Sequence, residues 1–186
     1  MPIATLNTER LRLRAWQDSD LAAFAALNAD PQVMRYFPAP LSAAASETQA
    51  AAIRQFMQQH GWGLWAVELP GHVPFIGFVG LAQVGDDLPL SPCVEIGWRL
   101  AAAHWGHGYA SEAARAALNH AFSQLQLPEV VSFTAVVNHP SRRVMERIGM
   151  RCAEEYFDHP RLPPGHRLRR HVVYRLNRQQ WREQAD

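Results

Sequence analysis

Two glycines between an alternating strand pattern and an alanine-rich helix pattern form the segment with the clearest chemical potential. The run WGHGYA, residues 105–110, follows alternating apolar residues at 94–100 and precedes a helix pattern that extends through Leu118. Backbone N–H groups at a helix N-terminus bind anions, because they lie at the positive end of the helix dipole. Glycine allows positive φ and a close approach of phosphate to the main chain. The segment therefore predicts a site for a phosphorylated cofactor.

Three kinds of phosphate loop have this layout, and the neighbouring residues separate them. A nucleoside-triphosphatase loop needs a lysine before its Ser or Thr, and this chain contains no lysine, since all 18 basic residues are arginine. A dinucleotide fold needs a third small residue and an acid about twenty positions later. Gly106, Gly108 and Ser111 meet the first requirement, but the strand pattern at 130–137 ends at Asn138 without that acid. The third kind is the pyrophosphate loop of acyl-coenzyme A acyltransferases.

The loop resembles that of the Gcn5-related N-acetyltransferase superfamily, whose pattern is Arg/Gln-x-x-Gly-x-Gly/Ala. Gly108 and Ala110 match this pattern, whereas Trp105 replaces the usual first polar residue. In the form W-G-x-G-Y-A-x-E-A, completed here by Glu112 and Ala113, the loop is similar to the RimJ/RimL-like branch, which acetylates ribosomal-protein N-termini. The exchange at Trp105 implies that phosphate binding depends more on backbone amides than on side chains.

A second block, NHPSRRVMERIGM at residues 138–150, is similar to the family segment N-x-x-S-x-x-[VL]-[LM]-E-[KR]-[LI]-G-[FM]. The residues alone predict a helix near Pro140 that is capped by Ser141 or Asn138 and ends at Gly149. An ordinary capped amphipathic helix would show the same pattern. The resemblance therefore depends on finding both blocks in the family order, and it extends over nearly the whole chain.

Composition favours one globular domain. The 186 residues, 48% of them hydrophobic, are enough for one core, and we expect a single domain over 1–186 with its core at about 8–177. A net charge of +1 predicts neither a nucleic-acid partner nor a membrane partner. The chain shows no membrane-span or signal-sequence pattern, so we expect a cytoplasmic protein. Cys93 and Cys152 form neither a disulfide framework nor a zinc pattern.

Hydrophobic periodicity and turn residues predict an α/β (α+β) chain with the element order βααβββαβαββ. Strands are predicted near 10–14, 62–69, 73–84, 94–100, 130–137, 151–157 and 168–176, and helices near 18–30, 46–60, 110–123 and 140–149. A crossover through the third helix requires one parallel strand pair in a mixed, mostly antiparallel sheet with flanking helices. In the acyl-CoA N-acyltransferase fold that the resemblance implies, this central pair splays apart and the acyl-pantetheine arm enters the opening.

Three local features are also predicted. Alternation places Arg10, Arg12 and Arg14 on a solvated strand face. Asp18 is predicted to cap the first helix. The segments at 35–41 and 158–167 are rich in proline and are predicted to be irregular loops.

Glu95 is the best candidate for a general base. A primary amine has a pKa near 10, so acetyl transfer at neutral pH needs a group or a water chain that accepts a proton. Glu95 lies on the strand that leads into the glycine loop, on the face opposite Val94, Ile96 and Trp98, and family members often place a base on this strand. The alternatives are a solvated strand end or an ion pair with an arginine.

The resemblance implies further site residues. Ser141 would donate a hydrogen bond to the departing thiolate, Asn138 would contact the pantetheine arm, and Phe37 would line the acceptor pocket. The expected cofactor-binding set is Ile96, Gly97, Trp98, Trp105, Gly106, His107, Gly108, Tyr109, Ala110, Asn138, Arg142 and Arg143. No metal is expected, because His104 and His107 lie in a loop without a third ligand in register.

These observations predict an acetyl-CoA-dependent N-acetyltransferase, with CoA as product. Its acceptor would be a primary amine, either a protein N-terminus or a small molecule, that attacks the thioester directly in a ternary complex. Neither cysteine has a positioned histidine that would favour an acyl-enzyme. A non-catalytic acyl-CoA sensor is the alternative. The expected oligomeric state is a monomer or a homodimer.

Overall fold

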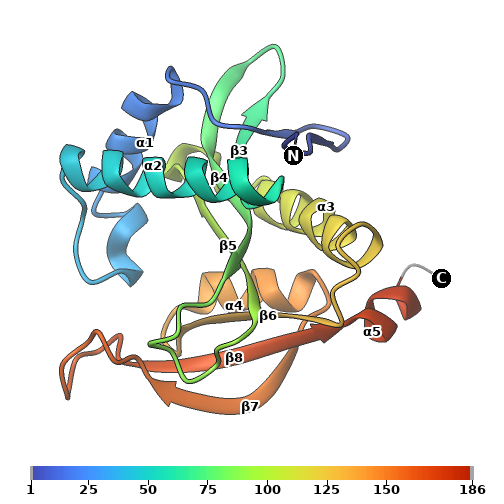
Figure 1. Cartoon of the computed structure of the whole chain (residues 1–186). Coiled ribbons are helices and arrows are strands. Elements are labelled where there is room, and N and C mark those ends of the chain that lie inside the picture. The colour runs from blue at the N-terminus through green and yellow to red at the C-terminus, as the bar shows by residue number, and fades with distance from the viewer. Residues whose placement is uncertain (1, 185–186) are drawn as a thin grey trace. The chain divides into compact units, whose positions relative to one another are not determined.

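The computed structural model describes residues 2–184, which divide into two compact units. Unit 1 contains the chain up to Leu81 and the segment Gly97–Ala117, and unit 2 contains Ala82–Ile96 and the chain from Leu118 onward. The chain passes between the units within two strands and one helix. Figure 1 shows the elements in chain order.

The predicted order βααβββαβαββ is confirmed, with an additional short strand before it and an additional helix after it. The strands are β1 Leu6–Asn7, β2 Arg12–Arg14, β3 Leu64–Leu69, β4 Val73–Gln83, β5 Val94–Leu100, β6 Glu129–Ala135, β7 Arg151–Asp158 and β8 Arg170–Asn177. The helices are α1 Asp20–Ala29, α2 Ala43–His60, α3 Tyr109–Ser123, α4 His139–Arg147 and α5 Arg178–Glu183, with 3-10 turns at Val33–Tyr36 and Ala102–His104.

The eight strands have the order β1-β2-β3-β4-β5-β6-β8-β7. Pairing is antiparallel between β1 and β2, β2 and β3, β3 and β4, β6 and β8, and β7 and β8. Strands β5 and β6 are parallel, with Glu95 opposite Val131. The mixed α/β class and the parallel pair that the crossover requires are therefore confirmed.

The core of unit 1 combines an aromatic cluster with the apolar face of α2. The Trp16 ring meets Phe24 of α1 edge-on at 4.9 Å between centroids. Helix α2 runs across β3 and β4 in Figure 1 and buries Ala50, Ile53 and Met57, whose spacing places them on one helix face. The helix begins three residues earlier than predicted, because the Ser42 hydroxyl accepts a 3.1 Å hydrogen bond from the Ala45 N–H.

The prediction that the arginine face of the first strand is solvated is wrong for Arg14. Arg14 is only 7% exposed, and its guanidinium donates to both carboxylate oxygens of Asp20 at 2.8 and 2.9 Å and to Glu68 at 2.7 Å. Burial is possible because two carboxylates compensate the charge. Asp18 is also not the cap of α1. The N-cap position is Ser19, whose side chain makes no capping hydrogen bond.

The sheet of unit 2 contains the start of β5 together with β6, β8 and β7. Val84, Leu88 and Val131 form a buried apolar cluster against which Phe133 and Phe157 pack. Strand β7 is the edge of the sheet and most of its residues are exposed. Its pairing with β8 is irregular between Cys152 and Tyr156, and Glu154 has a φ of 56°.

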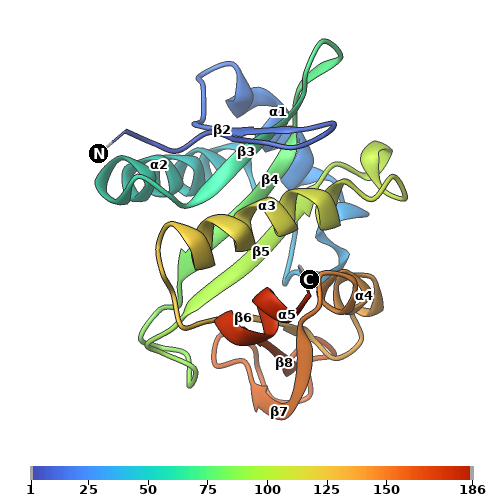
Figure 2. The ribbon, with the colours of Figure 1, turned by 90° about the vertical axis from the view of Figure 1, so that its right-hand side faces the viewer.

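Helix α5 was not predicted from the sequence, because it is short and mostly polar. It begins with a capping box, in which Asn177 and Gln180 each accept from the other's backbone N–H. Figure 2 shows it directly after β8. Among residues 2–184, no helix is both long and apolar enough to span a membrane.

Candidate active site

The glycine loop has the backbone conformation that its sequence predicts. Gly106 and Gly108 both have a φ of 81°, in the left-handed region that glycine occupies without strain. Helix α3 begins at Tyr109, and its first backbone hydrogen bond runs from Glu112 N–H to the Gly108 carbonyl. The N–H groups of the first turn therefore point out of the helix end, as an anion site requires.

Ser111, in the first turn of α3, adds a second polar feature to this helix end. The residue is 7% exposed, and its hydroxyl oxygen is buried without a hydrogen-bond partner within residues 2–184. Buried hydroxyls normally have partners, so this one is a candidate donor to a bound oxyanion. In the sequence Ser111 stands out only as a small residue of the glycine loop, because sequence does not show which hydroxyl lacks a partner.

The side chains of the loop are fixed by local contacts in unit 1. The Trp105 indole donates a 2.8 Å hydrogen bond to the Leu100 carbonyl and remains 36% exposed. The His107 ring stacks on Tyr109 at 5.4 Å. Burial, followed by the neighbouring His107, lowers the pKa of His104, so His104 is neutral at pH 7.

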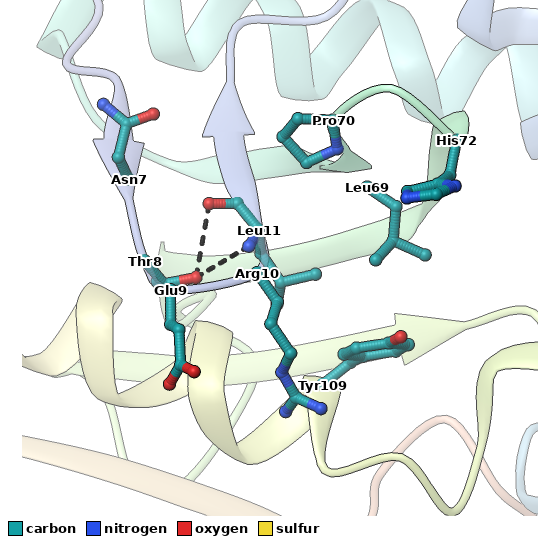
Figure 3. Close-up of a pocket in the computed structure, with 9 residues that line it drawn as sticks. All are labelled: Asn7, Thr8, Glu9, Arg10, Leu11, Leu69, Pro70, His72 and Tyr109. Atoms are coloured by element: carbon teal, nitrogen blue, oxygen red, sulfur yellow. Dashed lines mark hydrogen bonds between the residues drawn. The ribbon is translucent and has the colours of Figure 1, made fainter.

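Glu112 ties the N-terminal segment to the first turn of α3. Its carboxylate accepts from the Thr8 hydroxyl at 2.6 Å, from the Arg10 N–H at 2.9 Å and from Arg10 Nε at 2.7 Å. The Arg10 guanidinium also lies 4.8 Å from the centre of the Tyr109 ring (Figure 3). The acid of the W-G-x-G-Y-A-x-E-A pattern therefore supports the helix end that carries the loop.

Figure 3 shows a pocket beside this contact that contains only one residue of the predicted site, Tyr109. Thr8, which also lines the pocket, exchanges hydrogen bonds with the Leu11 backbone there. Neither of the predicted catalytic residues, Glu95 and Ser141, lines this pocket, so we do not assign it to the predicted site.

Phe37 lies in unit 1, directly after the first 3-10 turn. The prediction that 35–41 is entirely irregular is wrong at its start, because this turn reaches Tyr36 before the prolines end regular structure. Phe37 is 36% exposed, and the Arg99 guanidinium lies 4.1 Å from its ring centre.

Glu95, on β5 in unit 2, has an unusual acidity. Part of the Glu95 residue is exposed, but its carboxyl group is surrounded by protein atoms. This burial raises the pKa of the carboxyl from 4.5 to about 7. Within residues 2–184 it makes no ion pair, so the alternative of an arginine partner is wrong. A carboxyl that is half ionised near neutral pH is suited to accept a proton.

Ile96 and Gly97, two predicted cofactor-binding residues on β5, have different surroundings. The carbonyl of Ile96 accepts a 2.9 Å hydrogen bond from Ser132 in unit 2. In unit 1, Gly97 has open space where a side chain would be. Trp98, next along the strand, is half-buried.

The second sequence block forms α4 in unit 2, as predicted. The structure selects Asn138 as the cap, because its side-chain oxygen accepts from the Ser141 N–H at 3.3 Å. Its amide nitrogen donates to Thr134 at 2.9 Å, so both ends of the amide are occupied. The Ser141 hydroxyl has no capping role. Gly149, with a φ of 87°, ends the helix as predicted.

The two arginines of this block differ in their contacts. Arg142 donates to the Tyr174 hydroxyl and to the Val136 carbonyl, at 3.3 and 3.2 Å. Arg143 is exposed. Of this pair, Arg143 is therefore the freer to meet a phosphate group.

The predicted site residues fall into the two units as follows. Unit 1 holds Phe37, Gly97, Trp98, Trp105, Gly106, His107, Gly108, Tyr109 and Ala110, and unit 2 holds Glu95, Ile96, Asn138, Ser141, Arg142 and Arg143. Across residues 2–184, no three His, Cys, Asp or Glu side chains gather in a way that could hold a metal ion.

A mixed sheet with one parallel pair, and a glycine loop at the N-terminus of the following helix, are the features of an acyl-CoA-dependent acyltransferase. The chain belongs to the acetyltransferase (GNAT) domain family, whose model matches residues 10–151. It is therefore an acyltransferase of the N-acetyltransferase class.

Two similar proteins support this assignment, and a third shares the fold. The FsC-acetyl coenzyme A-N(2)-transacetylase of Aspergillus fumigatus is 31% identical over 188 residues, which cover 95% of this chain and 77% of that protein. The crystal structure of an acetyltransferase from Agrobacterium tumefaciens is 31% identical, with a TM-score of 0.76 and coverage of 95% and 96% of the two chains. Mycobacterium smegmatis RimJ in complex with CoA-disulfide shares the fold at 21% identity, with a TM-score of 0.72 and coverage of 95% and 87%.

Proposed function

We propose that this protein transfers the acetyl group of acetyl-CoA to a primary amine by direct attack in a ternary complex. The observation that carries the proposal is the helix end at Gly108–Ser111, with outward N–H groups and a buried hydroxyl without a partner. These groups fit the pyrophosphate of CoA. When bound, the cofactor supplies a thioester carbonyl as the electrophile.

Glu95 acts as the general base, directly or through a water molecule. It accepts the proton of the attacking ammonium group, so that the amine nitrogen has a free electron pair. The N–C bond forms as the C–S bond breaks, and the electron pair of that bond leaves with the CoA sulfur. The second proton of the amine nitrogen passes to this sulfur, so that the products are the amide and CoA. The Ser141 hydroxyl donates a hydrogen bond to this developing thiolate. Asn138 positions Ser141 through the cap of α4.

The cysteines support direct transfer over an acyl-enzyme. Burial, followed by the charge of Glu95, raises the pKa of the Cys93 thiol above its usual value. A raised pKa leaves little thiolate at neutral pH, and the thiolate is the nucleophilic form. Cys152 is exposed on the edge strand β7.

For the acceptor we propose an amine of the kind used by the RimJ/RimL-like branch or by small-molecule acetyltransferases. The W-G-x-G-Y-A-x-E-A pattern, which resembles that of the RimJ/RimL-like branch, supports a peptide N-terminus. The name of the Aspergillus fumigatus relative ascribes acetyl transfer to an N(2) nitrogen, which supports a small amine.

The first test is calorimetric titration with acetyl-CoA, followed by a thiol-release assay on the same sample with small amines and N-terminal peptides. Micromolar binding with turnover of any acceptor would support the proposal. Binding without turnover would instead favour an acyl-CoA sensor. A lack of binding would overturn the assignment of the helix end to CoA.

Substitution of the second loop glycine tests the cofactor site itself. We expect Gly108→Ala to weaken acetyl-CoA binding about 10-fold, because a side chain at positive φ strains the loop by about 1–2 kcal/mol. Calorimetric Kd values measure the effect. Gly71→Ala is the matched control, since Gly71 has a φ of 78° and open space around it in the β3–β4 turn. An equal loss of affinity in both variants would contradict a local role for Gly108.

A further inference from the structure

Arg99, on β5 in unit 1, is a buried cation without a charged partner. The residue is 8% exposed, and no carboxylate within residues 2–184 forms an ion pair with it. Burial lowers the pKa of its guanidinium to about 10, so the group still carries a positive charge at neutral pH. The structure thus holds a desolvated charge that no described residue of unit 1 neutralises.

The groups around Arg99 are neutral. Nη1 donates to the Asn28 side-chain oxygen at 2.6 Å and more weakly to Gln49 at 3.4 Å. The Asn28 orientation is fixed, because its amide nitrogen donates to the buried Ser46 hydroxyl at 3.1 Å. Nε of Arg99 is buried and has no acceptor within the described range 2–184. Two neutral amides therefore satisfy one nitrogen of the guanidinium, and no described carboxylate compensates its charge.

Two aromatic rings lie against the Arg99 guanidinium, and one of them is partly exposed at the surface. Its guanidinium carbon lies 4.1 Å from the ring centre of Phe37 and 5.3 Å from that of Phe78. Phe37 is 36% exposed and belongs to the loop after the first 3-10 turn, whereas Phe78 is buried. Aromatic faces stabilise a desolvated cation in part but do not replace an anion. A charged side chain is seldom this deeply buried unless it is paired.

We propose that Arg99, covered by Phe37, is the subsite that recognises a carboxylate on the acceptor amine. The inference rests on the proposed function, and it narrows the acceptors to amines that also carry an acid. A guanidinium binds a carboxylate through charge-assisted hydrogen bonds, and these hydrogen bonds are stronger where water is excluded. The carboxylate of the acceptor would then be the counter-ion that Arg99 lacks among the described residues.

The test uses amine acceptors in matched pairs, with and without the acid. Glycine, β-alanine and γ-aminobutyrate are compared with their amides, and phosphoethanolamine provides a phosphate in place of the carboxylate. The thiol-release assay gives kcat and KM for each acceptor. We expect kcat/KM to be at least about 10-fold higher for the best carboxylate-bearing member than for its amide, as one charge-assisted pair allows.

The decisive variant is Asn28→Asp, which supplies an internal carboxylate at the position now 2.6 Å from Nη1. The substitution conserves shape and removes the uncompensated charge, so we expect folding to be retained. KM for the acid acceptor should rise about 10-fold, to the level of the amide, while kcat/KM for the amide stays unchanged. Arg99→Gln should also abolish the preference. Arg12→Gln, at an exposed arginine paired with Glu68, is the control.

The outcomes separate this inference from the function on which it rests. Absence of turnover with every acceptor, the amides included, would overturn the proposed transferase activity. Turnover without preference for the acid, or a preference that Asn28→Asp leaves intact, would overturn the subsite alone. A preference for phosphoethanolamine over every carboxylate would overturn the assignment to a carboxylate.

Discussion

Replacement of Glu95 by glutamine is expected to lower kcat about 100- to 1000-fold while acetyl-CoA affinity stays within about two-fold. The amide has nearly the same shape as the carboxyl but cannot accept the amine proton. Glu95 lies on β5, outside the glycine loop that would hold the pyrophosphate, so cofactor binding should be retained. Rapid-mixing thiol release and calorimetry measure the two quantities separately.

The pH dependence gives a second readout of the same residue. A base must be ionised, so the kcat of the wild-type protein should rise with pH and level off above the pKa of Glu95, about 7. The residual activity of Glu95→Gln should lack this step. Glu129→Gln is the control, since Glu129 lies on the neighbouring strand β6 and pairs with Arg175 at 2.7 Å. An unchanged pH profile in Glu95→Gln would show that another group accepts the proton.

The same pKa shift makes a prediction about stability. The folded protein favours the neutral carboxyl, so the stability that Glu95 contributes falls as pH rises from its ordinary pKa of 4.5 through about 7. Glutamine does not titrate. The variant should therefore become more stable than the wild type above pH 7, by about 1–3 kcal/mol in urea unfolding. A functional base that costs stability is typical of active sites.

Removal of the Asp20 carboxylate should have the largest effect on stability. Asp20 is 1% exposed, accepts two hydrogen bonds from Arg14, and also accepts from the Gln17 N–H at 2.8 Å. Asp20→Ala leaves Arg14 buried with Glu68 as its remaining carboxylate partner. We expect the free energy of unfolding to fall by about 3–5 kcal/mol, measured by urea denaturation at pH 7.

A neighbouring residue provides the matched control for this change. Asp18 also pairs with an arginine, Arg54, at 2.8 Å, but its side chain is 87% exposed. Asp18→Ala should cost less than about 1 kcal/mol, because water solvates both charges. The double variant Asp20→Ala with Arg14→Met should recover part of the loss, since it removes a buried charge that has lost one of its two carboxylate partners. Equal effects of the two single variants would contradict the burial argument.

The order of the elements could be predicted from the sequence because it depends on local patterns. Alternation and turn residues placed β5 at its observed bounds, and two glycines predicted the positive φ angles of the loop. Both signals lie within a few residues along the chain. They identify an element without knowledge of what packs against it.

The burial and the bonding partners of individual polar side chains could not be predicted from such local patterns. Arg14 and Arg99 occupy strand positions whose alternation suggests nothing unusual, yet both are buried. The partners of Arg14 include Glu68, 54 residues away, and Arg99 bonds to Asn28, 71 residues away. These pairings follow from the tertiary fold, so no local pattern reveals them. For the same reason the sequence did not indicate that Arg99 lacks a counter-ion.

The edge of the sheet has a consequence for solubility. A free strand edge offers unpaired N–H and C=O groups to which another chain can add a strand, the first step of many aggregates. Strand β7 presents a bulge around Glu154, whose φ is 56°, and a charged neighbour, Glu155, that pairs with Arg175. A bulge disrupts the regular ladder, and charges resist close approach of a second strand. The open edge is thereby protected against polymerisation, while the neighbouring β6–β8 pairing stays regular.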